Sequence, residues 1–527
     1  MAPTQSIHFN LWSQPWIRVL DTDGKPTMVS IYECLTRAHE LGVLADPSPL
    51  TVVGTHRLLA AILQFIYDPQ TLDHLTTILQ SGRFELAKLD DFGVTYSHRF
   101  DLFDPVYPFL QTQDIAESAA EKSSVSRLFA EIPTETNRTL FMHVTDDEHR
   151  VCAACCAAGL VTISPFASAG GASYRPSING VPPVYILPLG ETLFDALATS
   201  LINPNFAPRS VSPERSAVAP WTSDEVILRS EQVISVGYVE SLLFPARRLM
   251  LFPNAVSTKC TRCGQPTGII VAEVAFEAGR WFDSKTTEPW GDPFVAFQLP
   301  KKEGEVRKAM MPKEGKALWR DYGTLFLSQA NGAGARPAVI SQIEALVNRG
   351  VIPASQTIRI RCVWLRTDSK AKIFDWGDYA LEVPALLLSI QQAETVINQA
   401  LGHSELIDSS LKFWFYLFSA KTDEKGTKRD RYKTVHQRLH ATYWQELAAP
   451  FATFIQTLGA AYEVGDEDAV NTTLVVWDET LFNTGERVFR ESIDQIGEQA
   501  NIIRARVEAE TALNRDFHNK RKDWIPQ

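Results

Sequence analysis

The chain has 527 residues, of which 45% are hydrophobic and 21% charged, and it carries a net charge of −11. Its length exceeds what one hydrophobic core organises, and its composition excludes an intrinsically disordered chain, so we expect two or three ordered domains. The acidic balance excludes a protein that coats nucleic acid over its whole surface, because phosphate binding requires positive charge where the backbone lies.

The first residues lack a basic segment followed by an apolar one, and no later stretch approaches about 18 uninterrupted apolar residues. We therefore expect a soluble, cytoplasmic protein. Seven cysteines in a chain without an export signal favour reduced thiols or metal ligands over a disulfide framework.

The N-terminal part mixes short strands with helices. Residues 16–20 and 28–31 flank the turn residues Asp21 to Gly24 and predict a hairpin. Apolar residues at helical spacing predict a buried helix between Pro49 and Pro69. The β-like runs at 184–187 and 357–364 stand among loops rich in proline and glycine, which indicates an irregular α+β domain.

Helix breakers become rare near residue 380, because only Pro384, Pro450 and Pro526 of the 30 prolines lie beyond it. We predict a domain boundary there: a large irregular α+β domain over 1–380 and a C-terminal four-helix bundle over 381–527. The bundle helices are expected at roughly 384–401, 404–419, 428–459 and 487–515. An apolar stripe is expected down one face of the last helix, made of Phe489, Ile493, Ile496, Ala500, Ile503 and Val507.

Two Cys-x-x-Cys pairs give the strongest chemical signal, Cys152 with Cys155 and Cys260 with Cys263. This spacing lets both thiolates of a pair reach one metal, and two pairs complete a tetrahedral shell, with Gly264 permitting the tight turn. We expect a structural zinc ion (Zn²⁺), because a closed shell of four thiolates leaves no position for water or substrate. Two unrelated buried pairs, a dithiol redox motif or chance are the alternatives, and Cys156 can take the place of Cys155.

Three segments have compositions that suit nucleic-acid contact. Phe141 lies in an apolar run before an acidic loop, where it can stack on a base or belong to the core. Gly170, Gly171 and Ala172 would let backbone approach a ligand, as would many surface loops. The cations at 421–433 can meet phosphates or simply form a solvated connection between helices; they include Lys428, Arg429 and Arg431.

Signatures of common catalytic sites are missing from the sequence: there is no G-x-x-x-x-G-K-[ST], H-E-x-x-H or G-x-S-x-G. We therefore expect a binding subunit rather than an enzyme. A zinc-dependent enzyme and a zinc-ribbon scaffold that holds only protein partners are the alternatives.

Taken in order, these features resemble the CasA family, the large subunit of the type I-E CRISPR surveillance complex Cascade. The resemblance covers essentially the whole chain. It rests on the two cysteine pairs, the small-residue loop between them, the helical C-terminus, and the segments FNLWSQPWI (residues 9–17) and YPFLQT (residues 107–112).

The resemblance implies a non-catalytic subunit that contacts the 5′ handle of the guide RNA and reads the protospacer-adjacent motif in target double-stranded DNA. Such a subunit also helps to open the duplex and recruits a helicase-nuclease, which cuts the DNA. The implied partners are the other Cascade subunits, the guide RNA and the target DNA, with no membrane. Sequence specificity would come from base pairing by the guide.

The family's recognition elements fall on definite positions of this sequence. Phe141, Met142 and His143 match the loop at the guide handle and motif. Gly170, Gly171 and Ala172 match the glycine loop that enters the minor groove, although this loop holds fewer glycines. Arg280 is the cation nearest to the family's lysine finger. The wedge that splits the first base pairs corresponds to Thr367, Asp368, Ser369 and Lys370, a segment without the family's glutamine.

Overall fold

The computed structural model describes residues 7–117, 122–132, 149–169, 174–208, 218–283, 289–300, 302, 305–313, 317–327, 334–368, 372–422 and 429–524. The chain divides into two compact units. Unit 1 comprises Met1–Pro312, Asn331–Leu346 and Ile358–Leu381, and unit 2 comprises Lys313–Ala330, Val347–Thr357 and Glu382–Gln527.

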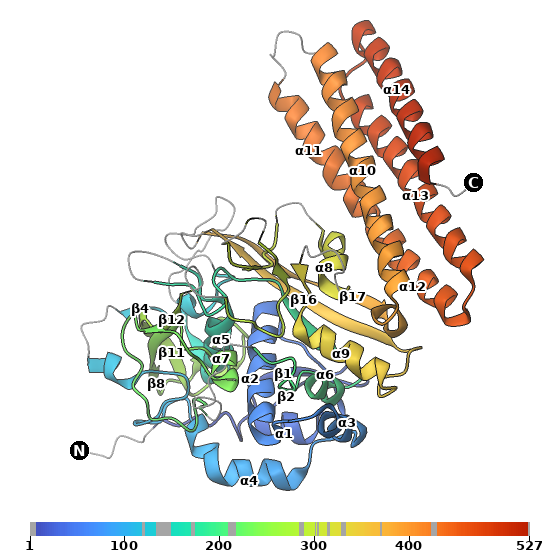
Figure 1. The fold of residues 1–527 in the computed structure, drawn as a ribbon. Coiled ribbons are helices and arrows are strands. Elements are labelled where there is room, and N and C mark those ends of the chain that lie inside the picture. Colours follow the sequence, from blue (N-terminus) through green and yellow to red (C-terminus); the bar gives the residue numbers. More distant parts are fainter. Residues whose placement is uncertain are drawn as a thin grey trace, which may run out of the picture. The chain divides into compact units, whose positions relative to one another are not determined.

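Unit 1 begins with a three-stranded antiparallel sheet in the order β2-β1-β3 (Figure 1). β1 (Ile17–Asp21) and β2 (Pro26–Val29) form the predicted hairpin, which is thereby confirmed. Gly24 adopts a φ of 78° in the connecting turn, a conformation that suits glycine because it has no Cβ. β3 (Leu41–Leu44) pairs with the other side of β1.

The predicted buried helix is α2 (Pro49–Tyr67), which runs through unit 1 (Figure 1). It is long and apolar enough to cross a membrane, but 89% of its most apolar stretch is buried inside the protein, as a core helix requires. α5 (Ala153–Phe166) packs closely on it, since a Cβ at Gly54 would lie 2.5 Å from the carbonyl oxygen of Val161. The fully buried Arg57 of α2 pairs with Asp292 at 2.8 Å, which ties the helix to a later segment.

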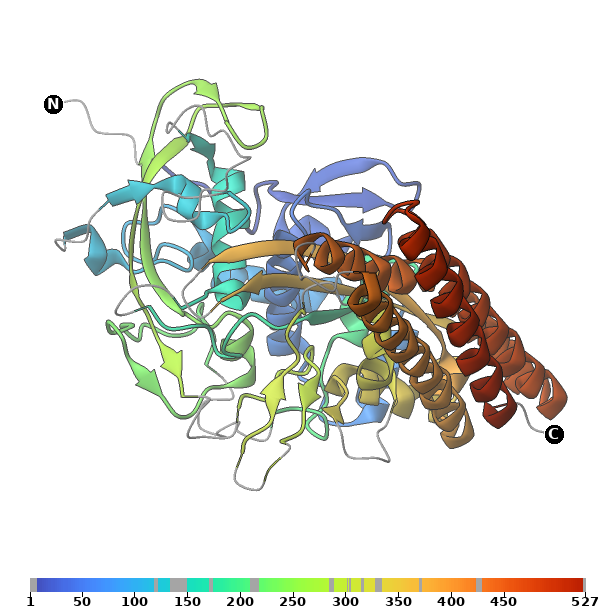
Figure 2. The same ribbon diagram turned by 90° about the horizontal axis from the view of Figure 1, so that it is seen from above.

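Two further sheets organise the rest of unit 1. In one, β11 (Ile270–Ala278) pairs antiparallel with β8 (Arg247–Asn254), β4 (Lys122–Ser124) and β5 (Val151–Cys152), and β8 and β11 run side by side as two long strands (Figure 2). The other has the order β17-β16-β6 and consists of β6 (Tyr185–Leu189), β16 (Thr357–Thr367) and β17 (Ile373–Pro384). β6 and β16 contain the two β-like runs predicted from the sequence.

Shorter elements complete both units. The α-helices are α1 (Ile31–Thr36), α3 (Leu72–Gln80), α4 (Leu86–Tyr96), α6 (Leu193–Thr199), α7 (Tyr238–Leu242), α8 (Tyr322–Phe326) and α9 (Ala338–Asn348). The remaining strands are β7 (Gln232–Val233), β9 (Thr258–Lys259), β10 (Pro266–Thr267), β12 (Trp281–Phe282), β13 (Phe297–Gln298), β14 (Lys308–Ala309) and β15 (Gly334–Ala335). Turns of 3₁₀ helix cover Ser97–Phe100, Gln113–Glu117, Val125–Leu128, Leu318–Asp321 and Ala385–Leu388.

Unit 2 is built from long helices that lie alongside one another (Figures 1 and 2). They are α10 (Gln391–Thr422), α11 (Arg429–Glu446), α12 (Ala448–Val464), α13 (Glu467–Asp494) and α14 (Ala500–Trp524). α10 and α13 each contact several of the others. The earlier segment of unit 2 joins their core, because the ring of Trp319 stacks on Phe451 with 4.7 Å between centroids.

The predicted helix boundaries in this part were wrong in four places. The helix predicted over 428–459 is two helices, α11 and α12, separated at Leu447. α10 is continuous across the predicted break, because Gly402 sits within the helix with nothing near its missing Cβ. α13 fills much of the gap predicted between the last two helices. The predicted final helix is two helices separated at Gly497, whose φ is 151°, and Ile503 and Val507 of the predicted apolar stripe are 45% and 58% exposed.

Candidate metal centre and nucleic-acid interface

Local backbone structure brings the two cysteine pairs together. Cys152 ends β5 and is the N-cap residue of α5, so Cys155 stands in the first turn of that helix. Cys260 and Cys263 lie in the turn between β9 and β10, where Gly264 has a φ of 73° and its N–H donates to the Cys260 carbonyl at 2.8 Å. The amide of Thr261 donates to the Arg150 carbonyl at 2.8 Å, which docks this turn beside β5.

The four sulfur atoms form a compact cluster. All the Sγ atoms of Cys152, Cys155, Cys260 and Cys263 lie within 4.8 Å of one another, and Cys152 Sγ is 3.9 Å from Cys263 Sγ. A tetrahedral shell with metal–sulfur bonds of about 2.3 Å separates its sulfurs by about 3.8 Å. The cluster therefore fits a metal ion with four thiolate ligands. Within the described ranges, no other group of three or more His, Cys, Asp or Glu side chains is arranged to hold an ion.

Cys155, rather than Cys156, completes this cluster. Cys156 is fully buried, its Sγ faces the Val151 carbonyl at 3.9 Å, and burial raises its pKa well above the ordinary value for a thiol. Cys34 and Cys362 are also fully buried, and burial raises the pKa of Cys34 to about 12. These three side chains behave as small apolar core residues.

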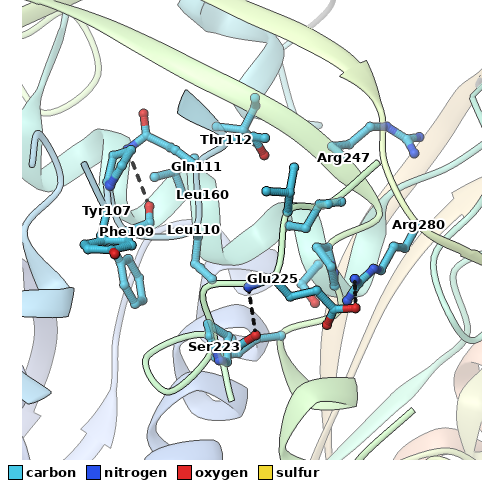
Figure 3. Close-up of a pocket in the computed structure, with 18 of the residues that line it drawn as sticks. Tyr107, Phe109, Leu110, Gln111, Thr112, Leu160, Ser223, Glu225, Arg247 and Arg280 are labelled. Carbon is cyan, nitrogen blue, oxygen red and sulfur yellow. Dashed lines mark hydrogen bonds and ion pairs between the residues drawn. The ribbon is translucent and has the colours of Figure 1, made fainter. Parts of the chain in front are cut away.

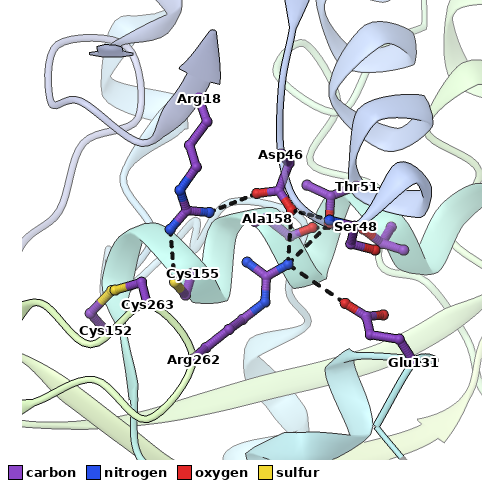
Figure 4. Close-up of polar contacts among 11 residues, drawn as sticks. Arg18, Asp46, Ser48, Thr51, Glu131, Cys152, Cys155, Ala158, Arg262 and Cys263 are labelled. Atoms are coloured by element: carbon purple, nitrogen blue, oxygen red, sulfur yellow. Dashed lines mark hydrogen bonds and ion pairs between the residues drawn. The ribbon is translucent and has the colours of Figure 1, made fainter. Parts of the chain in front are cut away.

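Two arginines flank the sulfur cluster and share one carboxylate (Figure 4). Arg18 donates to Cys155 Sγ at 3.7 Å and to Asp46 at 2.7 Å. Arg262, between the second pair of cysteines, donates to the other oxygen of Asp46 at 3.1 Å. A dication with four thiolates carries a net charge of about −2, so two guanidinium groups offset that charge locally. Asp46 holds both of them in place.

The small-residue loop that follows α5 is anchored at both ends by Arg247 of β8. Its guanidinium donates to the Ser168 carbonyl at 2.5 Å and to the Arg175 carbonyl at 2.7 Å. It also lies 4.9 Å from the ring centroid of Tyr174, whose hydroxyl donates to the Phe276 carbonyl at 3.1 Å. Burial lowers the pKa of Arg247 to about 10, which leaves it charged at neutral pH. Residues 168 and 175 are therefore drawn together at the base of the loop.

The remaining predicted recognition residues fall into two groups. Outside the described residues lie Phe141, Met142, His143, Gly170, Gly171, Ala172, Ser369, Lys370 and Lys428. Thr367 ends β16, and Asp368 begins the turn to β17, where its carboxylate accepts from the Lys372 amide at 2.9 Å. Arg429 and Arg431 belong to the first turn of α11.

Arg280 is buried, unlike the exposed cation that a finger requires. Its guanidinium forms ion pairs with Glu225, Glu231 and Glu240 at 2.9, 2.9 and 3.0 Å. It can reach a phosphate only by leaving these carboxylates, so its contact with nucleic acid stays a prediction. Arg280 lines a cavity of about 350 Å³ together with Arg247 and with Tyr107 to Thr112, the segment that supported the family resemblance (Figure 3).

Sequence reasoning missed the residues that support the cysteine cluster and the loop. Arg262 carried a partial signal, because it stands inside the second Cys-x-x-Cys pair. Arg18, Asp46 and Arg247 carried none, since each lies far along the chain from the group it contacts and belongs to no motif. Only the folded chain brings them to those positions.

Known proteins match the chain over almost its whole length. The family model for CRISPR-associated protein Cse1 matches residues 10–488. The CRISPR-associated protein CasA/Cse1 of Thermus thermophilus is 24% identical over 523 residues, covering 96% of this chain and 97% of that protein. The crystal structure of Cse1 from Acidimicrobium ferrooxidans is similar with a TM-score of 0.76 and 20% identity, covering 99% of each chain. A chain of a CRISPR RNA-guided surveillance complex is similar with a TM-score of 0.70 and 19% identity, covering 96% of this chain and 99% of that one. The family match spans most of the chain and the fold agrees from end to end, so this protein belongs to the CasA/Cse1 family.

Proposed function

We propose that this protein is the large, non-catalytic subunit of a type I-E Cascade complex. The observation that carries the proposal is the end-to-end match in fold to a chain of an RNA-guided surveillance complex, in a member of the Cse1 family. Its partners would be the other Cascade subunits, the guide RNA and target double-stranded DNA. A helicase-nuclease recruited after target binding would supply the cutting chemistry.

Zinc is the metal we propose for the four-cysteine cluster. Four thiolates in a tetrahedral arrangement are typical of structural zinc, and a bound ion would cross-link segments more than 100 residues apart in sequence. This chain's own contribution is to hold the thiolates at the end of β5 and in the β9–β10 turn, with Arg18 and Arg262 offsetting their charge. The donor set therefore favours a structural ion over the zinc-dependent enzyme.

Motif reading is assigned to the loop with Gly170, Gly171 and Ala172. Support comes from the described residues on either side of it, where Arg247 donates hydrogen bonds to the carbonyls of both Ser168 and Arg175. Backbone in the minor groove can accept several related sequences, because that groove carries a degenerate code. Phe141, Met142 and His143 are proposed to contact the guide handle, and Thr367, Asp368, Ser369 and Lys370 to stand where the duplex opens.

The test compares duplex binding by the assembled complex with and without this chain, on targets that differ only in the motif base pairs. We expect the complete complex to bind the matched motif more tightly, and the complex that lacks this chain to bind all targets equally. Equal discrimination by both complexes would refute motif reading. A zinc-ribbon scaffold that holds only protein partners would give that result.

A further inference from the structure

β17, at the edge of its sheet, exposes two aromatic side chains near the tip of the β16–β17 hairpin. Phe374 is 46% exposed and Trp376 is 38% exposed. Alternate residues of a strand share one face, so both rings leave the same side of β17. Residues 373, 375 and 377 are less exposed, whereas residues 378–380, which follow, are exposed as well.

The opposite face of the strand is braced by β16. Trp364 packs against the backbone at Gly377, where a Cβ would lie 2.8 Å from the indole ring. The indole N–H of Trp364 donates to Asp375 at 3.3 Å, and Arg366 pairs with the other carboxylate oxygen of Asp375 at 2.6 Å. These contacts hold the strand and therefore hold Phe374 and Trp376 at a fixed separation.

The surroundings of the pair are basic, in contrast to the chain as a whole. Residues 359–379 contain five Lys or Arg and three Asp, a net charge of +2 in a protein of net charge −11. Two cations lie at the Phe374 ring: Arg366 Cζ is 4.9 Å and Lys372 Nζ is 5.3 Å from the ring centroid. Exposed aromatic rings beside cations are what single-stranded nucleic acid recognises, because bases stack and phosphates need positive charge.

The spacing of the pair suits one nucleobase. Residues two apart on a strand are separated by about 6.7 Å, which is about twice the 3.4 Å between neighbouring bases of one DNA strand. We propose that Phe374 and Trp376 form a stacking site for an unpaired base of target DNA, with Lys372 beside the adjoining phosphate. The site rests on the proposed role of this hairpin in opening the duplex. Stacking on the two rings would stabilise the opened base in a hairpin whose wedge segment contains no glutamine.

The experiment uses the assembled complex with its guide RNA and a duplex that carries 2-aminopurine in the opened region but not at the base proposed to stack on the rings. The fluorescence of 2-aminopurine rises when it unstacks from its neighbours. Replacing both rings in the variant F374L/W376L keeps apolar side chains but removes the stacking surface. We expect the extent of duplex opening to fall by about tenfold or more, because each base–aromatic stack contributes substantially. F374Y/W376Y keeps both rings and should open DNA like the wild type.

Tyr379→Leu is the matched control, because Tyr379 is 37% exposed on the same strand but lies on the other face. It should open DNA normally. Wild-type opening by F374L/W376L would overturn the stacking site. Failure of that variant to assemble with the partner subunits, while it remains folded, would also overturn it, since the rings would then be a protein-docking surface.

Motif discrimination separates this proposal from the proposed function. F374L/W376L should discriminate between matched and altered motifs as well as the wild type does. If the wild-type complex itself does not discriminate, the proposed function fails, but the stacking site is not affected. If the double variant does not fold, photocross-linking answers the question with the unaltered protein. Bromodeoxyuridine in the opened strand should cross-link to the peptide that contains Phe374 and Trp376, and a complex that opens DNA without that cross-link would refute the site.

Discussion

Individual cysteines in this chain have distinct roles despite their similar burial. Cys152 is a member of the sulfur cluster, whereas Cys156, four residues later, faces a carbonyl in the core. We expect Cys152→Ser to lose bound zinc and to melt at a lower temperature, because a hydroxyl is a poor replacement for a thiolate ligand. Metal analysis of the purified protein and thermal unfolding measure the two effects.

Cys156→Ser is the control for the metal site. It should keep one zinc ion per chain even if the buried hydroxyl makes the protein less stable. Equal zinc content in Cys152→Ser and the wild type would contradict the four-cysteine site. If Cys156→Ser loses zinc, Cys156 is a metal ligand in place of Cys155.

Arg247 offers a residue-scale test of the loop. Replacing it with methionine keeps much of the aliphatic volume but removes both hydrogen bonds to the loop base. We expect Arg247→Met to reduce motif discrimination by about tenfold in the assembled complex, because losing charged hydrogen bonds of about 1.5 kcal/mol or more frees the loop. Binding ratios for matched and altered motifs give the readout.

Arg248 is the matched control for Arg247. It is the next residue of β8, is buried, and pairs with Glu277 and Asp114 instead of the loop. Arg248→Met should lower the melting temperature without changing the binding ratio. If both variants lose motif discrimination and stability to the same extent, the effect of Arg247→Met is a general loss of stability and not a loss of the loop contacts.

At the scale of elements, the packing of α10 on α11 includes a buried carboxylate. Asp408 of α10 is fully buried and pairs with His440 of α11 and with Lys412, the latter at 2.7 Å. Burial alone would raise the pKa of Asp408, but the hydrogen bonds from His440 and Lys412 outweigh it and lower the pKa below the ordinary value. The ionised form is therefore the one that stabilises the folded state.

A lowered folded-state pKa fixes the sign of the pH dependence. Stability from Asp408 is fully present above its unfolded pKa of about 3.9 and is lost as pH falls through the lower folded-state pKa. Asp408→Asn should be less stable by about 2 kcal/mol at pH 7, and the difference from the wild type should shrink toward pH 3. Denaturant unfolding at several pH values measures it, and a difference independent of pH would contradict the ion-pair role.

The connection between α10 and α11 carries the second element-scale prediction. Reversing Lys428, Arg429 and Arg431 to glutamate should flatten the salt dependence of DNA binding by the assembled complex, by about 0.9 in slope for each phosphate that is no longer neutralised. Arg490→Glu is a control, because Arg490 is 52% exposed and pairs with Glu486 on α13. An unchanged slope in the triple variant would leave the segment as a solvated connection.

Regular elements were predicted well where the local sequence decides the structure. The β1–β2 hairpin has a turn sequence with a glycine that takes a positive φ, and α2 has apolar residues at helical spacing throughout. The bundle was harder, because Gly402 lies inside α10 without ending it, whereas Gly497 separates α13 from α14. The two glycines look alike in sequence, so composition alone does not show which of them ends a helix.

At the scale of the whole molecule, sequence patterns indicated a C-terminal helical part. They did not indicate the earlier segment of the chain that packs with its helices. Trp319 and Tyr322 come well before the predicted boundary at residue 380, yet both rings pack against Phe451 in unit 2. No local pattern signals such contacts, because they depend on chain segments that meet only after folding. The boundary at residue 380 itself stays a prediction.

The cysteine spacing predicted the sulfur cluster, because the two-residue spacing of Cys-x-x-Cys by itself lets both thiolates reach one metal. Its supporting arginines, the anchored loop and the exposed pair on β17 are products of tertiary structure. α5 connects the candidate metal centre to the loop, since Cys152 is its N-cap residue and the helix ends shortly before Ser168. A metal that fixes the start of α5 would thereby help to fix the loop that follows it.

The most direct measurement is a selection from target duplexes in which the motif positions are randomised, made with complexes that contain or lack this chain. We expect the complete complex to enrich a small set of motifs, and the complex without this chain to retain all motifs equally. Enrichment of the same motifs in its absence would contradict the assignment of motif recognition to this subunit.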